Sequence, residues 1–184
     1  TFTGSFPAFY FQSEHASIPG PVGVTVSRNV ILGIRDTRQG GIQFDRVTNG
    51  IVELNVVTNL AATGISVNGG TDVEVTGNTV SSNDGYGIRT NSDSTVTGNN
   101  ANSNTWSGIL AGAGSVVTGN GSSLNQGYGI WAGSGATLTG NSARSNSFDG
   151  FHLDGDNLLD QNTAIWNSGA NIGTCITAVL ASIG

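Results

Sequence analysis

Hydrophobic and polar residues alternate in short segments along most of the chain. Ile65 and Val67 stand two residues apart, as do Val73 and Val75, with polar or small residues between them. Side chains two residues apart lie on the same face of a β-strand, so each segment is predicted to be a strand with one apolar face. Gly and Asn, which are common in tight turns, separate the segments. The pattern therefore predicts short strands joined by tight corners.

The same pattern recurs with a step of 21 residues. The Gly-Asn pair keeps this step through Gly77-Asn78, Gly98-Asn99, Gly119-Asn120 and Gly140-Asn141, and continues as Gln161-Asn162. A second asparagine keeps it as well, at Asn83, Asn104, Asn125, Asn146 and Asn167. The glycines that open the units, Gly87, Gly108, Gly129 and Gly150, also step by 21, and Gly41 and Gly64 precede them at steps of 23. A fixed period near 20 residues is typical of repeat architectures.

The composition of the unit favours a β-solenoid over a leucine-rich repeat, because the units carry Val, Ile and Thr rather than several Leu. Stacked coils would bury two columns of side chains, each member contributing roughly 1.5–3 kcal/mol. The expected columns are Ile42, Ile65, Ile88, Ile109, Ile130, Phe151 and Ile172, and Val75, Val96, Val117, Leu138 and Leu159. The Asn83 column is expected to form a ladder of side-chain amides between coils. Gly77 and its equivalents are expected to adopt a positive φ at the corners.

The unit Gly-Ile-x-x…Val-Thr-Gly-Asn-x-x…Asn-x-x-Gly resembles the coil of right-handed parallel β-helix repeat proteins, the pectate-lyase-like superfamily. The resemblance extends from Gly41 to Ile172. It implies an all-β fold, a right-handed parallel β-helix (β-solenoid) of six to seven coils. The superfamily includes polysaccharide lyases, hydrolases and epimerases as well as phage tailspikes and adhesins, so the resemblance does not select one function.

The segments outside the repeat are expected to protect its two ends. Residues 1–20 are rich in Phe and are predicted to be an N-terminal cap or extension, or a segment donated to a neighbouring subunit. Residues 21–171 would form the parallel β-helix, and residues 172–184 a C-terminal cap or docking tail. The single cysteine, Cys175, excludes an internal disulfide, which leaves an inert thiol or an intermolecular bridge. Because the chain begins at Thr1, we expect a processed protein or a piece of a longer one.

The charge composition narrows the possible partners. Charged residues make up 10% of the chain, Lys is absent, and the net charge is −6. These values argue against a nucleic-acid or anionic-membrane partner. The apolar run from Ile172 to Ile183 is too short to span a bilayer. The abundance of Asn, Ser and Thr favours an extracellular, cell-surface or virion location, and no cofactor is expected.

Aromatic residues gather at one corner of the predicted coils. Tyr86 and Tyr128 precede the opening glycine by one residue, whereas Trp106 and Phe148 precede it by two, which would let rings on adjacent coils interleave. An outward row is expected at Ser66, Arg89, Leu110, Trp131 and His152. The candidate interface or sugar platform is therefore Tyr86, Arg89, Trp106, Tyr128, Trp131, Phe148 and His152. Packing of the rings over the coil edge is the alternative.

An acidic cluster near the end of the repeat is the remaining candidate for chemistry. Asp154, Asp156 and Asp160 are candidate calcium ligands, and with Asp149 and His152 they could form an acid/base pair. Asp154-Gly-Asp156-Asn is equally typical of a turn. No catalytic residue is assigned, because regular coils leave no room for the long loops that build an active-site groove.

These observations favour a non-catalytic structural β-solenoid, extracellular or part of a virion, that self-associates as a homo-oligomer, filament, fibre or surface decoration subunit. The alternative is a β-helix that binds or processes a polysaccharide, like a lyase or an epimerase. A minor alternative is an ice-binding protein, because Thr76, Thr97, Thr118 and Thr139 form an outward row.

Overall fold

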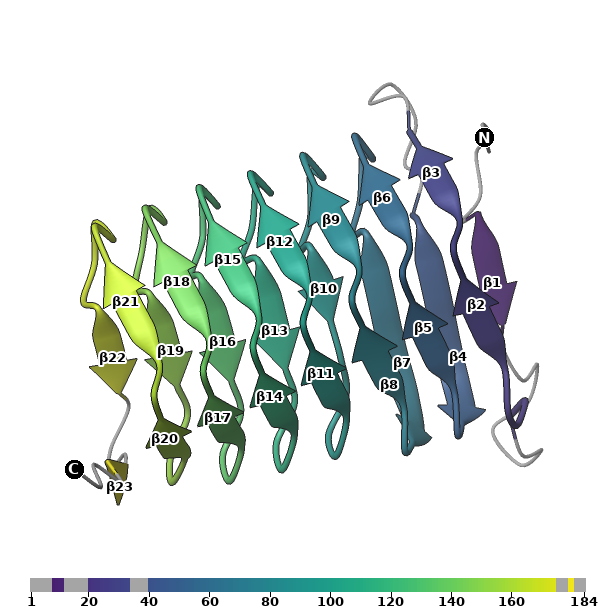
Figure 1. Ribbon diagram of the computed structural model, residues 1–184. Coiled ribbons are helices and arrows are strands. Elements are labelled where there is room, and N and C mark those ends of the chain that lie inside the picture. Colours follow the sequence, from purple (N-terminus) through teal and green to yellow (C-terminus); the bar gives the residue numbers. More distant parts are fainter. Residues whose placement is uncertain (1–7, 12–19, 34–39, 175–178, 181–184) are drawn as a thin grey trace.

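The computed structural model describes residues 8–11, 20–33, 40–174 and 179–180, and every regular element in them is a β-strand. The chain winds into coils that stack along one axis, from the N-terminal to the C-terminal end (Figure 1). All strand pairs between coils are parallel in this part of the chain. Six complete coils run from Ile42 to Ile165. The predicted all-β parallel solenoid is confirmed.

Each coil contributes one strand to each of three sheets, A, B and C, in that order. Sheet A has eight strands, β1 (Phe9–Phe11), β4 (Ile42–Thr48), β7 (Ile65–Thr71), β10 (Ile88–Arg89), β13 (Ile109–Ala111), β16 (Ile130–Ala132), β19 (Phe151–Leu153) and β22 (Ile172–Thr174). Sheet B also has eight, β2 (Thr25–Ser27), β5 (Ile51–Glu53), β8 (Glu74–Thr76), β11 (Thr95–Thr97), β14 (Val116–Thr118), β17 (Thr137–Thr139), β20 (Leu158–Asp160) and β23 (Val179–Leu180). Sheet C has seven, β3 (Val30–Leu32), β6 (Val56–Thr58), β9 (Thr79–Ser81), β12 (Asn100–Asn102), β15 (Gly121–Ser123), β18 (Ser142–Arg144) and β21 (Thr163–Ile165).

The two predicted hydrophobic columns form the interior of the solenoid. Ile88 pairs with Ile65 and Ile109 in sheet A, and Val96 pairs with Val75 and Val117 in sheet B. Members of both columns are almost completely buried from the first coil to the sixth. Ile172 is the exception, with 41% of its surface exposed. It lies in β22, the last strand of sheet A, so no further strand of that sheet covers it.

Two asparagine ladders fix the corners. The predicted ladder, at the corner between sheets C and A, is confirmed: each Nδ2 from Asn83 to Asn146 donates to the Oδ1 of the next member at 2.9–3.1 Å. A second ladder, which the sequence analysis did not assign, lies at the corner between sheets B and C. Its members are Asn29, Asn55, Asn78, Asn99, Asn120, Asn141 and Asn162.

The residue before each ladder asparagine has a positive φ. At the corner between sheets B and C this residue is a glycine in four coils, as predicted (Gly77, Gly98, Gly119 and Gly140, with φ of 63–65°), and it is Arg28, Leu54 or Gln161 before the other three ladder members. At the corner between sheets C and A the same conformation is held by residues with side chains, namely Ser82, Ser103, Leu124, Ser145 and Trp166. A left-handed conformation costs such residues roughly 1–2 kcal/mol, so the buried asparagine bonds at this corner offset a local cost.

The described parts of both end segments continue the coil pattern. Phe9–Phe11 pairs with β4, and Phe9 and Phe11 pack against the core. At the other end β22 pairs with β19, and β23 pairs with β20. Residues 1–7 and 12–19 of the predicted cap, and Cys175 in the predicted tail, lie outside the described residues.

Candidate functional site

The candidate interface residues lie on the outer face of sheet A and at the corner that precedes this sheet. Strand pairing aligns Ser66, Arg89, Leu110, Trp131 and His152 as one row, as the sequence predicted. The row continues at the N-terminal end through Gln43 and Tyr10. Successive members are one coil apart, which is about 4.8 Å. The face is therefore a continuous strip that runs along the axis of the solenoid.

Four rings pack together in the C-terminal half of this strip. His152 stacks on Tyr128 with ring centroids 4.2 Å apart and planes 14° apart. Trp131 meets both rings edge-on, at 5.6 Å from Tyr128 and 5.4 Å from His152. Phe148 lies at 5.6 Å from Tyr128 on the other side. Their row and spacing in the sequence predict a shared surface, and the structure brings all four into one cluster.

Two carboxylates orient the cluster. Asp149 Oδ2 lies 3.1 Å from His152 Nδ1, and Asp149 Oδ1 accepts a hydrogen bond from the backbone N–H of Ala170 at 2.8 Å. Asp154 Oδ2 accepts a hydrogen bond from Trp131 Nε1 at 2.8 Å. A carboxylate can only accept, so His152 must carry its proton on Nδ1 to make the first of these bonds. In the neutral ring Nε2 is then an acceptor.

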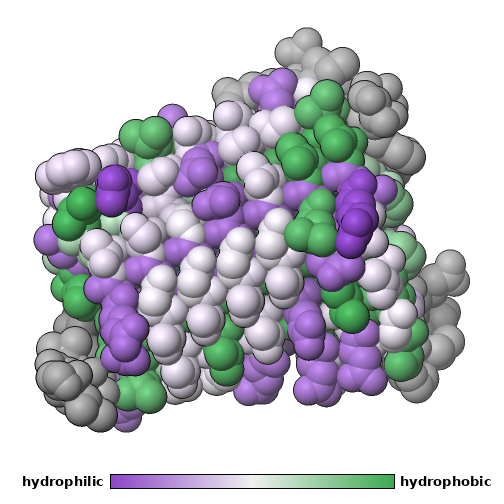
Figure 2. All heavy atoms as spheres, viewed as in Figure 1, coloured by the Kyte–Doolittle hydropathy of each residue, from purple (hydrophilic) through white to green (hydrophobic). Residues whose placement is uncertain are grey.

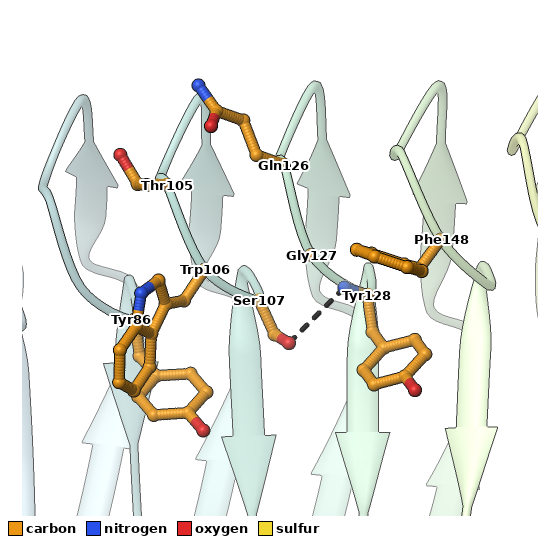
Figure 3. A pocket seen from close by; sticks show the side chains of 8 residues that line it. All are labelled: Tyr86, Thr105, Trp106, Ser107, Gln126, Gly127, Tyr128 and Phe148. Carbon is orange, nitrogen blue, oxygen red and sulfur yellow. Dashed lines mark hydrogen bonds between the residues drawn. The ribbon is translucent and has the colours of Figure 1, made fainter.

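A cleft of about 290 Å³ separates this cluster from a second aromatic pair. One wall is Tyr86 and Trp106, whose centroids are 4.9 Å apart, and the other wall is Tyr128 and Phe148 (Figure 3). Ser107 lies between the walls and accepts a hydrogen bond from the backbone N–H of Tyr128 at 3.2 Å. Trp106 and Phe148 are 54% and 55% exposed. The cleft is near the lower limit for small-molecule pockets, which begin at about 300 Å³.

Alternation of large and small residues makes the cleft. Trp106 and Phe148 alternate from coil to coil with Gly85, Gly127 and Gly169. A Cβ atom on Gly127 would lie 2.6 Å from the backbone nitrogen of Ser107, so only glycine fits there. The predicted interleaving of rings is confirmed, since each exposed ring packs against the tyrosine of a neighbouring coil.

The N-terminal half of the strip is polar. Arg89 Nη1 donates to Asn68 Oδ1 at 2.9 Å, and Asn68 Nδ2 donates to Asp45 Oδ1 at 3.0 Å. The Tyr10 hydroxyl donates to Asp45 Oδ2 at 2.8 Å. This hydrogen bond, together with partial burial and repulsion between the two negative charges, holds the pKa of Tyr10 above its usual value. Because its guanidinium donates to Asn68, on the preceding coil, Arg89 points away from the aromatic cluster.

The candidate calcium ligands occupy different parts of the coil. Asp160 belongs to sheet B, where it pairs with Thr139, whereas Asp154 lies beside Trp131 at the edge of sheet A. Asp156 follows Gly155, whose φ of 75° marks a tight corner. Among the described residues, no group of three or more His, Cys, Asp or Glu side chains is arranged to hold a metal ion.

Sheet B presents the threonine row that suggested ice binding. Thr76, Thr97, Thr118 and Thr139 align across adjacent coils. The parallel row two residues earlier aligns Glu74, Thr95, Val116, Thr137 and Leu158. Over the same five coils, threonine fills four positions of the first row, which ends at Asp160, and only two positions of the other.

The fold and the repeats define a class of protein. The sequence matches the family described as the right-handed β-helix region over residues 17–169, and the chain belongs to this family. Comparison with curated proteins finds no match.

Two solved structures share the fold, and both are A-modules of mannuronan C-5 epimerases from Azotobacter vinelandii. The AlgE4 module is 13% identical with a TM-score of 0.66, covering 88% of this chain and 58% of the module. The AlgE6 module is 15% identical with a TM-score of 0.63, covering 89% of this chain and 59% of the module. This chain thus spans less than two thirds of either module, and the likeness concerns the fold alone. The described part of the chain contains no helix long and apolar enough to cross a membrane.

Proposed function

We propose that this protein binds a polysaccharide along the outer face of sheet A. The observation that carries the proposal is the cleft between two aromatic pairs, which continues into the Trp131–His152 cluster on the same strip. Flat rings beside hydrogen-bonding groups suit sugars, which have apolar ring faces and a rim of hydroxyl groups. The epimerase modules that share the fold act on a polysaccharide, mannuronan, by their names, which supports the same class of ligand.

Replacing Trp131 with Ala should weaken polysaccharide binding at least tenfold, which corresponds to about 1.4 kcal/mol. The substitution removes a ring that contacts both Tyr128 and His152 and so dismantles the platform. Retardation of the protein in native gels that contain dissolved polysaccharides would measure the affinity. A thermal melt would establish that the variant is folded.

Trp166→Ala is the matched control. Trp166 is 73% exposed, and it stacks against Arg144 of sheet C, away from the sheet A strip. Its loss should leave the retardation unchanged. If every polymer that binds retards the wild type and both variants equally, the outer face of sheet A is not the binding site. If no polymer retards the wild type, the protein does not bind polysaccharides.

Self-association is a second candidate, and an exposed apolar patch on the first coils favours it. Val30, Leu32, Leu54 and Val56 are each between 38% and 50% exposed. Figure 2 shows hydrophobic residues gathered at this end, over β3 and β6, on a face that is otherwise mostly hydrophilic or neutral. Contiguous apolar patches on a soluble surface often mark contacts between proteins. A lateral contact between two copies would cover this patch.

The double substitution of Val30 and Val56 with Glu should convert an oligomer into a monomer if this patch is the contact. Light scattering after size-exclusion chromatography would give the mass. Thr118→Glu, on sheet B, is the control and should leave the mass unchanged. A monomeric wild-type protein across the accessible concentration range would contradict the second candidate.

A further inference from the structure

Charge is distributed unevenly along the sheet A strip. Arg46 and Arg89 lie in β4 and β10, in its N-terminal half. In the C-terminal half, the outward residues of β13, β16, β19 and β22 are Leu110, Trp131, His152 and Gly173. Arginine does not occur among the described residues of these four strands, and the sequence has no lysine. The charged side chains in contact with the aromatic cluster are carboxylates, those of Asp149 beside His152 and Asp154 beside Trp131.

Arg89 does not offset these carboxylates. Its guanidinium donates to Asn68, on the preceding coil, whereas Trp131 lies two coils further toward the C-terminal end. Two coils correspond to about 10 Å between backbones. This distance exceeds the Debye length of about 8 Å at physiological ionic strength. A ligand on the aromatic cluster would therefore experience a negative local potential.

The same groups suit an uncharged ligand that donates hydrogen bonds. Asp154 Oδ1 lies 3.8 Å from His152 Nε2, which is too long for a hydrogen bond, and the Asp154 side chain is 43% exposed. In the neutral ring, with the proton on Nδ1 toward Asp149, Nε2 of His152 is an acceptor. Two acceptors thus lie next to these rings, Nε2 of His152, which stacks on Tyr128, and the carboxylate of Asp154 at the Nε1 edge of Trp131. Sugar hydroxyl groups are donors that match them, and hydrogen bonds to a carboxylate are stronger than those to a neutral acceptor.

Building on the proposed function, we infer that the polymer bound is a neutral polysaccharide and not a polyuronate. A polyuronate carries a carboxylate on each sugar, and over the aromatic cluster these charges would lie beside Asp149 and Asp154, whereas the described residues of β13, β16, β19 and β22 include no arginine to pair with them. A neutral chain would stack on the same rings and donate its hydroxyl groups to the same acceptors without this repulsion. Neutral polymers should bind at least tenfold more tightly than polyuronates.

A panel of soluble polymers tests the inference. The neutral members are a β-glucan, a galactomannan and an arabinoxylan, and the acidic members are polygalacturonate and polymannuronate. Calorimetric titration at two salt concentrations would give the affinities and their dependence on charge. Binding of a neutral member that is lost in Trp131→Ala and insensitive to salt is the expected result.

A charge variant provides an independent readout. Replacing both Asp149 and Asp154 with Asn keeps an acceptor oxygen at each position but removes two negative charges. The affinity for polyuronates should rise at least fivefold relative to that for neutral polymers, with the melting transition checked in parallel. An unchanged ratio of the two affinities would overturn the role assigned to these charges.

Failure of the preference for a neutral polymer and failure of the proposed function would give different results. Tight binding of a polyuronate that depends on Trp131 would overturn the preference for a neutral polymer and leave the proposed function intact. Failure of every polymer in the panel to bind would overturn both.

Discussion

Val117→Asp should abolish the cooperative unfolding transition of the solenoid. Val117 is completely buried in β14, between Val96 of the preceding coil and Leu138 of the following one. A carboxylate at this position would be surrounded by aliphatic side chains with no partner for its charge. The destabilisation should exceed about 4 kcal/mol, a loss comparable to the whole stability of many domains. Circular dichroism during heating would show a non-cooperative or absent transition.

The adjacent residue provides the control. Val116 lies in the same strand but faces outward and is 45% exposed. Val116→Asp introduces the same charge into the same strand, and its effect on the free energy of unfolding should stay within about 0.5 kcal/mol. Similar melting of the two variants would contradict the register that places Val117 inside.

Asn125→Ala should cost about 3 kcal/mol of folding free energy. The side-chain Nδ2 of Asn125 donates to Asn146 Oδ1 and to the backbone oxygen of Ala101, and its Oδ1 accepts from both the backbone nitrogen and Nδ2 of Asn104. All of these groups are buried, and each buried group left without a partner costs about 1–3 kcal/mol. Urea denaturation would measure the loss.

The two ends of this ladder should be less sensitive. Asn83 is bonded on one side to Asn104 and on the other to the backbone N–H of Leu60 and, through a long bond of 3.4 Å, to the backbone oxygen of Val57, because the preceding coil has no asparagine there. Asn167 is only partly buried, in the last described coil. We expect Asn83→Ala to cost less than Asn125→Ala, and Asn167→Ala to cost least. Equal losses at all three positions would show that the ladder does not act as a connected stack.

The fold could be predicted from the sequence because every coil must satisfy the same physical requirements. An inward column needs Ile or Val at one position, a ladder needs Asn, and a tight corner needs a residue that tolerates positive φ. The 21-residue step made the Ile88, Val96 and Asn83 columns visible before the structure was known. The Asn78 ladder carries the same step, and its period could have predicted it. Asn beside Gly is also a common turn sequence, so the composition of the pair by itself indicates a turn and not a ladder.

The site could be predicted only in part from the sequence, because it depends on which side chains of different coils contact one another. The row from Arg89 to His152 follows from the strand alternation, and the structure confirms that arrangement. The stacking of His152 on Tyr128, and the bond from Trp131 to Asp154, depend on side-chain rotamers that a pattern does not encode. The direction of Arg89, away from the rings, likewise became apparent only with the position of Asn68.

The ladders repeat with a period of one coil and the aromatic surface with a period of two coils, and this difference bears on how such a chain can evolve. Each coil from the second to the sixth supplies one member of each asparagine ladder, so duplicating one of these coils preserves the core and both ladders. The rings return only after two coils, since Tyr86 corresponds to Tyr128 and Trp106 to Phe148. Duplicating a single coil would place two exposed rings, or two of the glycines that alternate with them, on adjacent coils and so break the alternation. The solenoid can therefore lengthen one coil at a time, whereas its aromatic surface can gain a new cleft only through the duplication of a coil pair.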